Sequence, residues 1–285
     1  YNTEAVNELT GILTKAKGMK CDAYNVEEII NCAQGVDLIV NALPLEFGKN
    51  VLDAALAVKA NYQDFSSTTA FDEDVNIGWI RGMKYQFEVY SPKFEEIGRL
   101  AIIGTGSAPG VICCATRDAM KYLDTCDTIY NFVWEGAEAK RFQPFWWSPE
   151  TAIEDMRQPA FAYENDEIIM RPPFEDPVTR KYDYMDREVV FYNHNHDEPV
   201  QYGINAKEYF KGCKNAYFKY AGVGMEFAEP LYRAGLLSHD EREVKGRKVV
   251  PFDLIVDSIP APPKFAREIK EIIDEGIVSD DGCMV

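Results

Sequence analysis

The stretch VDLIVNALP, residues 36–44, decides the fold class because an apolar run ends abruptly at a polar residue and a proline. A run of this kind, bounded by Gly35 and Pro44, is typical of the central strand of a parallel sheet that is covered on both faces. Ligands of open α/β sheets bind beyond the carboxyl ends of the strands. The pattern therefore predicts that Asn41 and the turn after it lie beside a bound molecule.

Helices and strands alternate on both sides of this stretch. The apolar spacing and the chain breakers predict strands at 20–23, 36–41, 61–65 and 100–105. The helix caps and the apolar spacing predict helices at 3–17, 48–59 and near 92–99, and two more helices that begin at residues 25 and 111. Alternation with short connections is the signature of an α/β fold with a doubly wound parallel sheet. We assign residues 1–123 to a first domain of this class.

Beyond about Leu123 the pattern changes to longer strands and to loops rich in proline and aromatic residues. We expect strands within 127–134, 188–199 and 215–222, a helix around 227–237, and a strand, a loop and a helix over 248–273. This mixture predicts an α+β second domain, residues 124–285, with a mostly antiparallel sheet.

Composition limits the classes of function. The 285-residue chain carries a formal net charge of −17, which argues against nucleic acid or a membrane as partner and favours a small-molecule ligand. Seven widely spaced cysteines without a CxxC pair argue against a disulfide framework or a zinc site, and favour reduced thiols in the cytoplasm. No apolar run approaches the roughly 18 residues that span a bilayer, and no signal peptide is visible.

The turn GTGSAPG, residues 104–110, lies between a predicted strand and a helix that Pro109 can begin. Free backbone N–H groups at such a helix start can bind an anion or polarise a carbonyl group. Alternatively, the glycines only supply positive φ angles in a tight loop. The turn is not the dinucleotide-binding GxGxxG motif, which belongs on the first strand-to-helix turn of a βαβ unit.

Polar residues follow two neighbouring strands. Asn41 ends one predicted strand, and Asp64, Ser66 and Ser67 follow the next, so parallel pairing would bring them to one edge of the sheet. Asp64 could orient a cofactor amide or exchange a proton at a carbon–nitrogen centre. The alternative is that Asp64 caps the turn after its strand.

Two further segments leave alternatives open. His194 and His196 would share one face of a strand, as a metal site requires. Their polar neighbours are also typical of a turn between strands, and we expect no metal.

The segment FWWSP, residues 145–149, either forms an aromatic surface over a ligand or anchors the base of a long loop in the core.

Four segments in this order resemble the saccharopine dehydrogenase family, which includes saccharopine reductases, lysine dehydrogenases and carboxynorspermidine dehydrogenases: DLIVNALP, ANYQDFSS, AIIGTGSAPGV and EGAEAKRFQPFWWSPETAIEDM. The resemblance implies a Rossmann-type domain that binds NAD or NADP, followed by a substrate and dimerisation domain, and hence a homodimer. Family members carry GxGxxG before the first helix found here and a further C-terminal segment. The resemblance therefore implies an internal fragment of a longer chain.

The resemblance also implies roles for single residues. The cofactor would lie against Asp22, Asn41, Ala42, Leu43, Pro44, Ser66, Pro109 and Gly110, with Asp64 near the nicotinamide. The substrate pocket would be lined by Trp146, Trp147 and Ser148. Saccharopine reductases show Asp-Pro-Gly where this chain has Ala-Pro-Gly at 108–110, which weakens the case for saccharopine as the substrate.

The function implied is NAD(P)-dependent oxidation or reduction of a CH–NH bond in an amino acid or polyamine precursor, through an imine. We expect Asp64 to exchange the nitrogen proton, with His194 or His196 as second candidates, and a cation among Arg141, Arg157 and Arg171 to bind a substrate carboxylate. Two alternatives stay open: a catalytically inactive dimeric structural homologue, and a synthase that uses NAD as an internal hydride carrier.

Overall fold

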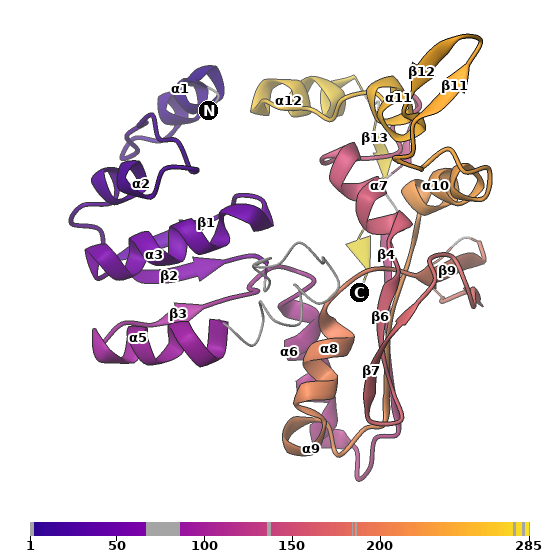
Figure 1. The fold of residues 1–285 in the computed structure, drawn as a ribbon, viewed down its shortest axis with the longest axis horizontal. Coiled ribbons are helices and arrows are strands. Elements are labelled where there is room, and N and C mark those ends of the chain that lie inside the picture. Colours follow the sequence, from indigo (N-terminus) through magenta and orange to yellow (C-terminus); the bar gives the residue numbers. More distant parts are fainter. Residues whose placement is uncertain are drawn as a thin grey trace. The chain divides into compact units, whose positions relative to one another are not determined.

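The computed structural model describes residues 3–66, 86–135, 138–183, 185, 187–275, 278–280 and 283–284. The chain forms two compact units, Tyr1–Tyr122 and Leu123–Val285 (Figure 1). The first is a parallel α/β unit and the second an α+β unit, so the predicted fold class is confirmed.

The first unit alternates helices and strands as the sequence predicts. Its strands β1, β2 and β3 are parallel and lie in that order. The elements are α1 (Thr3–Ile12), α2 (Val26–Cys32), β1 (Leu38–Asn41), η1 (Leu45–Phe47), α3 (Gly48–Val58), β2 (Asn61–Asp64), the π-helical turn η2 (Gln86–Tyr90), α5 (Ser91–Glu96), β3 (Ala101–Ile102), α6 (Val111–Ala119) and η3 (Met120–Tyr122).

Local sequence explains the best-formed helices of this unit. Asn25 caps α2, because its side chain accepts a hydrogen bond from the Glu27 N–H. The small and aliphatic residues of α3 pack against β1 and β2 and bury Leu52 completely. The helix ends where Lys59 turns into the left-handed region, at φ 56°. These elements form one hydrophobic cluster that also includes Tyr62 and Phe94.

Three predictions for this unit are wrong. Residues 20–23 form no strand, and the helix predicted to reach Lys17 ends at Ile12 and buries none of its residues. The strand β1 is an edge of the described sheet rather than a central strand, and Leu38 and Val40 are 47% and 51% exposed. The shared reason is that apolar residues form buried strands and longer helices only where a neighbour covers them, and no described element pairs with the free edge of β1.

The second unit begins with the long strand β4 and contains all the remaining elements. They are β4 (Thr128–Glu135), β5 (Glu138–Ala139), α7 (Pro149–Arg157), β6 (Ala160–Glu164), β7 (Glu167–Arg171), β8 (Val178–Arg180), β9 (Val189–Asn193), α8 (Glu198–Ile204), α9 (Ala206–Tyr209), β10 (Asn215–Gly222), α10 (Val223–Arg233), β11 (Arg242–Val244), β12 (Arg247–Val249), α11 (Pro251–Ser258), α12 (Ala266–Asp274), β13 (Val278–Asp280) and β14 (Cys283–Met284).

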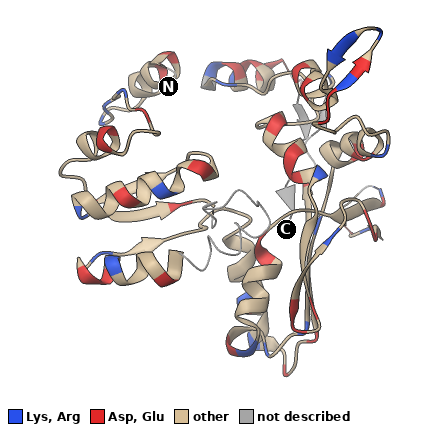
Figure 2. Ribbon diagram, viewed as in Figure 1, with Lys and Arg blue, Asp and Glu red and all other residues tan. Residues whose placement is uncertain are grey.

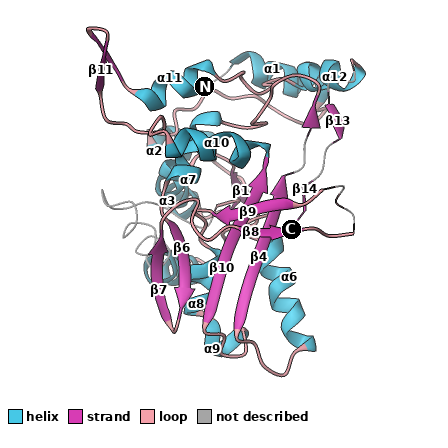
Figure 3. Ribbon diagram, turned by 90° about the vertical axis from the view of Figure 1, so that its right-hand side faces the viewer, coloured by secondary structure: helices cyan, strands magenta, loops and turns pink. Residues whose placement is uncertain are grey.

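The main sheet of this unit has the order β14-β4-β10-β6-β7, and β9 also pairs with β10 (Figure 3). Only the β4–β10 pair is parallel among its described pairs, so the expected mostly antiparallel sheet is confirmed. Two boundaries differ from the prediction. The helix α10 begins at Val223 rather than near Phe227, and residues 248–273 contain two helices instead of one, because Pro251 begins a helix after β12.

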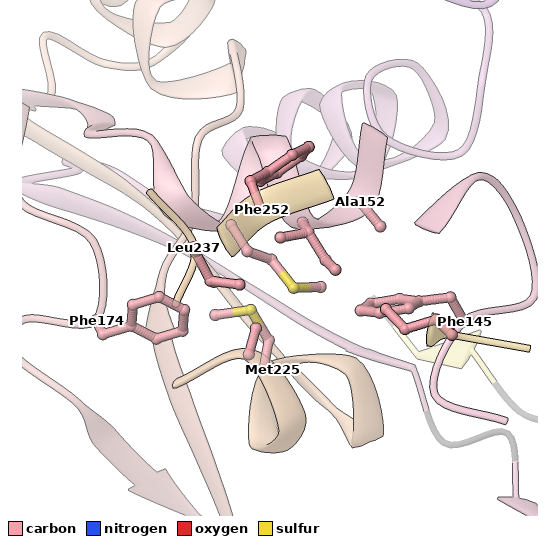
Figure 4. Close-up of a cluster of buried hydrophobic side chains, with 10 residues drawn as sticks. Phe145, Ala152, Phe174, Met225, Leu237 and Phe252 are labelled. Atoms are coloured by element: carbon pink, nitrogen blue, oxygen red, sulfur yellow. The ribbon is translucent and has the colours of Figure 1, made fainter. Parts of the chain in front are cut away.

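The core of the second unit draws residues from α7, α10 and α11 and from the loops that carry Phe145, Phe174 and Leu237 (Figure 4). Phe145, Phe174, Met225 and Phe252 are each at most 3% exposed and belong to one cluster. The packing is tight, since a Cβ added at Gly224 would lie 2.6 Å from Phe145 Cε1. The aromatic loop is therefore anchored by Phe145, as one of the two sequence interpretations proposed.

Acidic residues are spread over both units, and basic residues are fewer (Figure 2). Within the part of the chain that the structure describes, no helix combines the length and the apolarity that crossing a membrane requires. The six cysteines whose side chains are described are free thiols.

Candidate functional site

The carboxyl ends of β1 and β2 lie side by side, as the sequence predicts. In the parallel register Asn41 is paired with Asp64, and both residues are buried. The Asn41 Nδ2 donates to Tyr62 Oη at 3.1 Å, and Tyr62 Oη donates to Asp64 Oδ2 at 2.8 Å. A buried chain of hydrogen bonds therefore joins the two strand ends.

Asp64 also connects β2 to the glycine-rich turn. Its Oδ1 accepts a 2.7 Å hydrogen bond from the Gly104 N–H, and its backbone carbonyl accepts from the Thr105 N–H and hydroxyl. Burial raises the pKa of Asp64 to about 6, while the bonds from Gly104 and Tyr62 favour the carboxylate and oppose that rise. Both carboxylate oxygens are engaged within the unit. Asp64 thus holds the end of β2 to the glycine-rich turn, and its role in proton exchange stays a prediction.

The turn after β3 is tight because glycines let its backbone segments approach closely. Gly110 has a φ of 129°, and a Cβ there would lie only 2.2 Å from the Gly106 carbonyl oxygen. A Cβ on Gly106 would in turn lie 2.9 Å from the carbonyl oxygen of Phe65, at the end of β2. The glycines are therefore needed for close backbone approach.

The helix α6 begins at Val111, as the sequence predicts, because Gly110 before it is not in a helical conformation. The N–H groups of Val111 and Ile112 donate to carbonyl oxygens of the turn, those of Gly106 and Ser107. Since these groups already have partners, the structure favours the tight loop over the anion site. Pro109 itself is buried.

The turn after β1 presents an open surface. Ala42, Leu43 and Pro44 are all exposed, and the Leu43 N–H donates to Asn41 Oδ1 at 3.1 Å, which fixes the turn. Ser66 is half-buried, and the other predicted serine, Ser67, lies outside the described residues. An exposed turn beside two aligned strand ends fits a nucleotide at the carboxyl edge of the sheet.

Asp22 lies exposed in the loop before α2, away from the strand ends in sequence. Its Oδ1 accepts from the Tyr24 N–H at 3.0 Å, and its own N–H donates to Glu28. The carboxylate thus shapes the start of α2, and contact with an adenine stays a prediction.

The aromatic segment at residues 145–149 has both buried and exposed side chains. Phe145 is buried, Trp147 is 44% exposed, and the Trp146 Nε1 is buried without a hydrogen-bond partner. Ser148 is the N-cap of α7, because its hydroxyl accepts from the Thr151 N–H at 3.3 Å. The two tryptophans stay candidates for a substrate wall.

Two of the three predicted carboxylate-binding arginines are already paired. Arg157 binds both carboxylate oxygens of Glu154 at 2.7 Å, and Arg171 forms a similar pair with Glu164. Arg141 is exposed and lines a groove of about 450 Å³ beside α12. Binding a substrate carboxylate at Arg157 or Arg171 would therefore require breaking a two-pronged ion pair.

The two candidate histidines lie in a buried cluster directly after β9. Because that strand ends at Asn193, His194 and His196 do not share a strand face as the pattern suggested. His196 Nδ1 lies 2.8 Å from Glu198 Oε2, and its ring stacks on Phe218 with centroids 4.1 Å apart. His194 stacks on Tyr220. The segment is not a solvated polar turn, since His194 and Glu198 are buried.

Charge and burial act against each other in this cluster. Burial lowers the pKa of His194 well below its ordinary value, and His196 lowers it further. Burial would also lower the pKa of His196, but the carboxylates of Glu198, Asp197 and Asp155 outweigh it and raise that pKa to about 9. Burial raises the pKa of Asp155 to about 7 and raises that of Asp197 as well. Groups titrating near neutrality in one cluster are typical of functional sites.

His196, Asp197 and Glu198 each offer one ligand atom, and these atoms lie within 4.8 Å of one another. This donor set could receive a cation, and the expected absence of a metal stays a prediction. Sequence reasoning missed the contribution of α7, namely Asp155 and Gln158. Asp155 stands beside the buried positions Ala152 and Met156 in the helical repeat, a signal that could have placed it near the core.

Comparisons with known proteins were made against families, curated sequences and solved structures. No protein-family model matches the chain. It is 27% identical over 270 residues to the carboxynorspermidine synthase of Vibrio alginolyticus, and 27% identical over 272 residues to the carboxyaminopropylagmatine dehydrogenase of Synechocystis. These alignments cover 91% and 89% of this chain but 62% of each relative.

The fold is similar to that of apo saccharopine dehydrogenase (L-Glu forming) from Saccharomyces cerevisiae. The TM-score is 0.59 at 13% identity, over 94% of this chain and 63% of that one. The chain thus spans less than two thirds of the length of the relatives it matches. Together with the order of motifs, these similarities support the resemblance of the chain to the saccharopine dehydrogenase family in sequence and in fold.

Proposed function

We propose that the protein is an oxidoreductase that uses NAD or NADP and acts on a CH–NH bond of an amine, through an imine. The observation that carries the proposal is the similarity, along nine tenths of the chain, to a relative named carboxynorspermidine synthase and a second named carboxyaminopropylagmatine dehydrogenase. A polyamine precursor is therefore favoured over saccharopine as the substrate, in line with Ala108 in place of the aspartate of saccharopine reductases.

The cofactor is assigned to the carboxyl edge of β1, β2 and β3. The exposed turn at 42–44 would lie along the ribose and pyrophosphate, and the ends of β2 and β3 near the nicotinamide. The nicotinamide supplies the hydride acceptor or donor. Asn41, Tyr62 and Asp64 keep this edge rigid through their buried hydrogen bonds, which supports a fixed position for the ring.

Exchange of the nitrogen proton is proposed for Asp64, with His196 as the second candidate. The His196 side chain is 23% exposed and its Nδ1 pairs with Glu198 Oε2, so any exchange there would use its other ring nitrogen, Nε2. The homodimer and the cytoplasmic location that the sequence predicts remain part of this proposal.

The nucleotide assignment is tested by titrating the full-length protein with NADH and NADPH. Leu43→Glu places a negative charge on the exposed turn, where it would repel the pyrophosphate, so we expect binding weakened by about tenfold, or ~1.4 kcal/mol. Leu9→Glu, at a comparably exposed position of α1, is the control and should bind as the unaltered protein does. Equal affinities for both variants would contradict the assignment, and no binding of either nucleotide to any form would favour the structural homologue.

A further inference from the structure

The segment 194–198 contains three buried side-chain atoms without hydrogen-bond partners. They are His194 Nδ1, Asn195 Oδ1 and Glu198 Oε1, on residues that are 5%, 3% and 0% exposed. Buried polar atoms in native proteins are nearly always paired, and a buried carboxylate oxygen is among the costliest to leave alone. Three such atoms within five residues leave hydrogen-bonding capacity that a bound donor would satisfy.

The unpartnered atoms share one chemical character. The amide oxygen of Asn195 and the carboxylate oxygen of Glu198 can only accept hydrogen bonds, and a neutral His194 accepts through Nδ1 when Nε2 carries the proton. The amide nitrogen of Asn195 is already used, since Nδ2 donates to Gln158 Oε1 at 3.1 Å. A group that pairs with these atoms must therefore be a hydrogen-bond donor.

The charged groups around the segment indicate which charge a bound donor would carry. Asp197 and Glu198 from the segment and Asp155 from α7 surround a single cationic group, His196. Of the other charged groups of α7, Glu150 is exposed, and Glu154 and Arg157 neutralise each other through two hydrogen bonds. The strand β10 contributes the neutral rings of Phe218 and Tyr220. Above about pH 7, where Asp155 and Asp197 ionise, the buried carboxylates outnumber His196, which favours a positively charged ligand.

We propose that His194, Asn195 and Glu198 form a binding site for an alkylammonium group, and that this site holds an amino group of the amine substrate. The identity of the ligand as the substrate rests on the proposed function. An ammonium group has N–H donors and no acceptor, so its chemistry suits side-chain atoms that can only accept. The metal alternative is weaker, because two of its three ligand residues, His196 and Glu198, already pair with each other. The partly exposed His196 ring marks the open side of the cluster.

The test is calorimetric titration of the full-length protein with 1,4-diaminobutane, with 1,4-butanediol as a neutral compound of the same length. We expect the diamine to bind and the diol not to bind. Glu198→Gln keeps the shape but removes the charge, and should weaken diamine binding by about tenfold or more. Glu150→Gln, an exposed residue of the same helix as Asp155, is the matched control and should leave diamine binding unchanged.

Two results would overturn the site. One is equal affinity for the diamine and the diol in the unaltered protein, a measurement that needs no variant and so decides the matter even where Glu198→Gln does not fold. The other is displacement of the diamine by Mn²⁺ or Zn²⁺, which would identify a metal centre. Because NADH binding is measured separately, a protein that binds NADH but no diamine loses only this inference. One that binds the diamine but neither nucleotide loses only the proposed oxidoreductase function.

Discussion

Asp64 shows how one buried carboxylate can set the pH dependence of the whole first unit. It is 4% exposed, and its pKa is raised from 3.8 to about 6, chiefly by burial. Between these two values the folded state binds more protons than the unfolded state, so the free energy of unfolding falls as pH rises. The contribution is full below pH 3.8 and is lost as pH passes 6.

We therefore predict that the first unit loses about 2 kcal/mol of unfolding free energy between pH 4 and pH 6.5 through this residue alone. Asp64→Asn removes the titrating group and should flatten the pH profile, as measured by urea unfolding across that range. Asp37→Asn, at an exposed position before β1, serves as the control. A profile equally steep in both variants would show that Asp64 is not the group responsible.

Gly110 offers a second test at the scale of a residue. A Cβ at this position would meet two backbone oxygens at 2.2 and 2.8 Å, and φ is 129°. We expect Gly110→Ala to lower the free energy of unfolding by about 3 kcal/mol. At Gly98, φ is also positive but nothing lies within 4 Å of the added Cβ, so Gly98→Ala should cost about 1 kcal/mol. Equal costs in thermal unfolding would mean that the turn can open.

At the scale of the element, the start of α7 separates a structural from a substrate-binding role for Ser148. The hydroxyl caps the helix, so Ser148→Ala should reduce the free energy of unfolding by about 1 kcal/mol. In the exposed last turn of α11, Ser258 hydrogen-bonds to its own helix, and Ser258→Ala should change stability by less than about 0.5 kcal/mol. Unchanged stability together with a large rise in substrate KM for Ser148→Ala would favour the substrate role.

Elements were predictable where local signals and packing agree. The Ala- and Leu-rich helix α3 and the strand β2 fall within a residue of their predicted bounds, and β10 matches its prediction. The strand at 20–23 failed because a strand needs a neighbour, and sequence does not show whether one is present. The rim formed by Asn41 and Asp64 followed from parallel pairing alone.

The buried cluster was only half predictable. The sequence placed His194, His196, Asp197 and Glu198 together because they are adjacent in the chain. It could not bring in Asp155 from α7, more than thirty residues away, or show that a segment as polar as Asn193–Asp197 is buried. Those facts depend on how α7, β9 and β10 pack, which is a property of the tertiary structure.

At the scale of the molecule, each unit has its own hydrophobic core. Leu52 belongs to the cluster of the first unit and Phe145 to that of the second. Leu52→Ala and Phe145→Ala should each cost about 3–4 kcal/mol. Hydrogen exchange read by mass spectrometry should show faster exchange confined to the unit that carries the substitution. Equal acceleration in both units for either variant would mean that the chain unfolds as a single cooperative body.

The activity itself is a property of the whole protein, and an isotope experiment tests it most directly. NADH or NADPH carrying deuterium at C4 is supplied with an aliphatic diamine and an aldehyde that bears a carboxylate, and the product is analysed by mass spectrometry. We predict that deuterium appears on the carbon bound to the new secondary nitrogen, with one nucleotide oxidised for each product formed. A product in which that carbon carries no deuterium would contradict this account. If a secondary amine and ammonia formed from the diamine alone with a catalytic amount of NAD⁺, the diamine itself would supply the hydride, and the result would point to NAD as an internal hydride carrier; no product at all, with an intact fold, would point to the structural homologue.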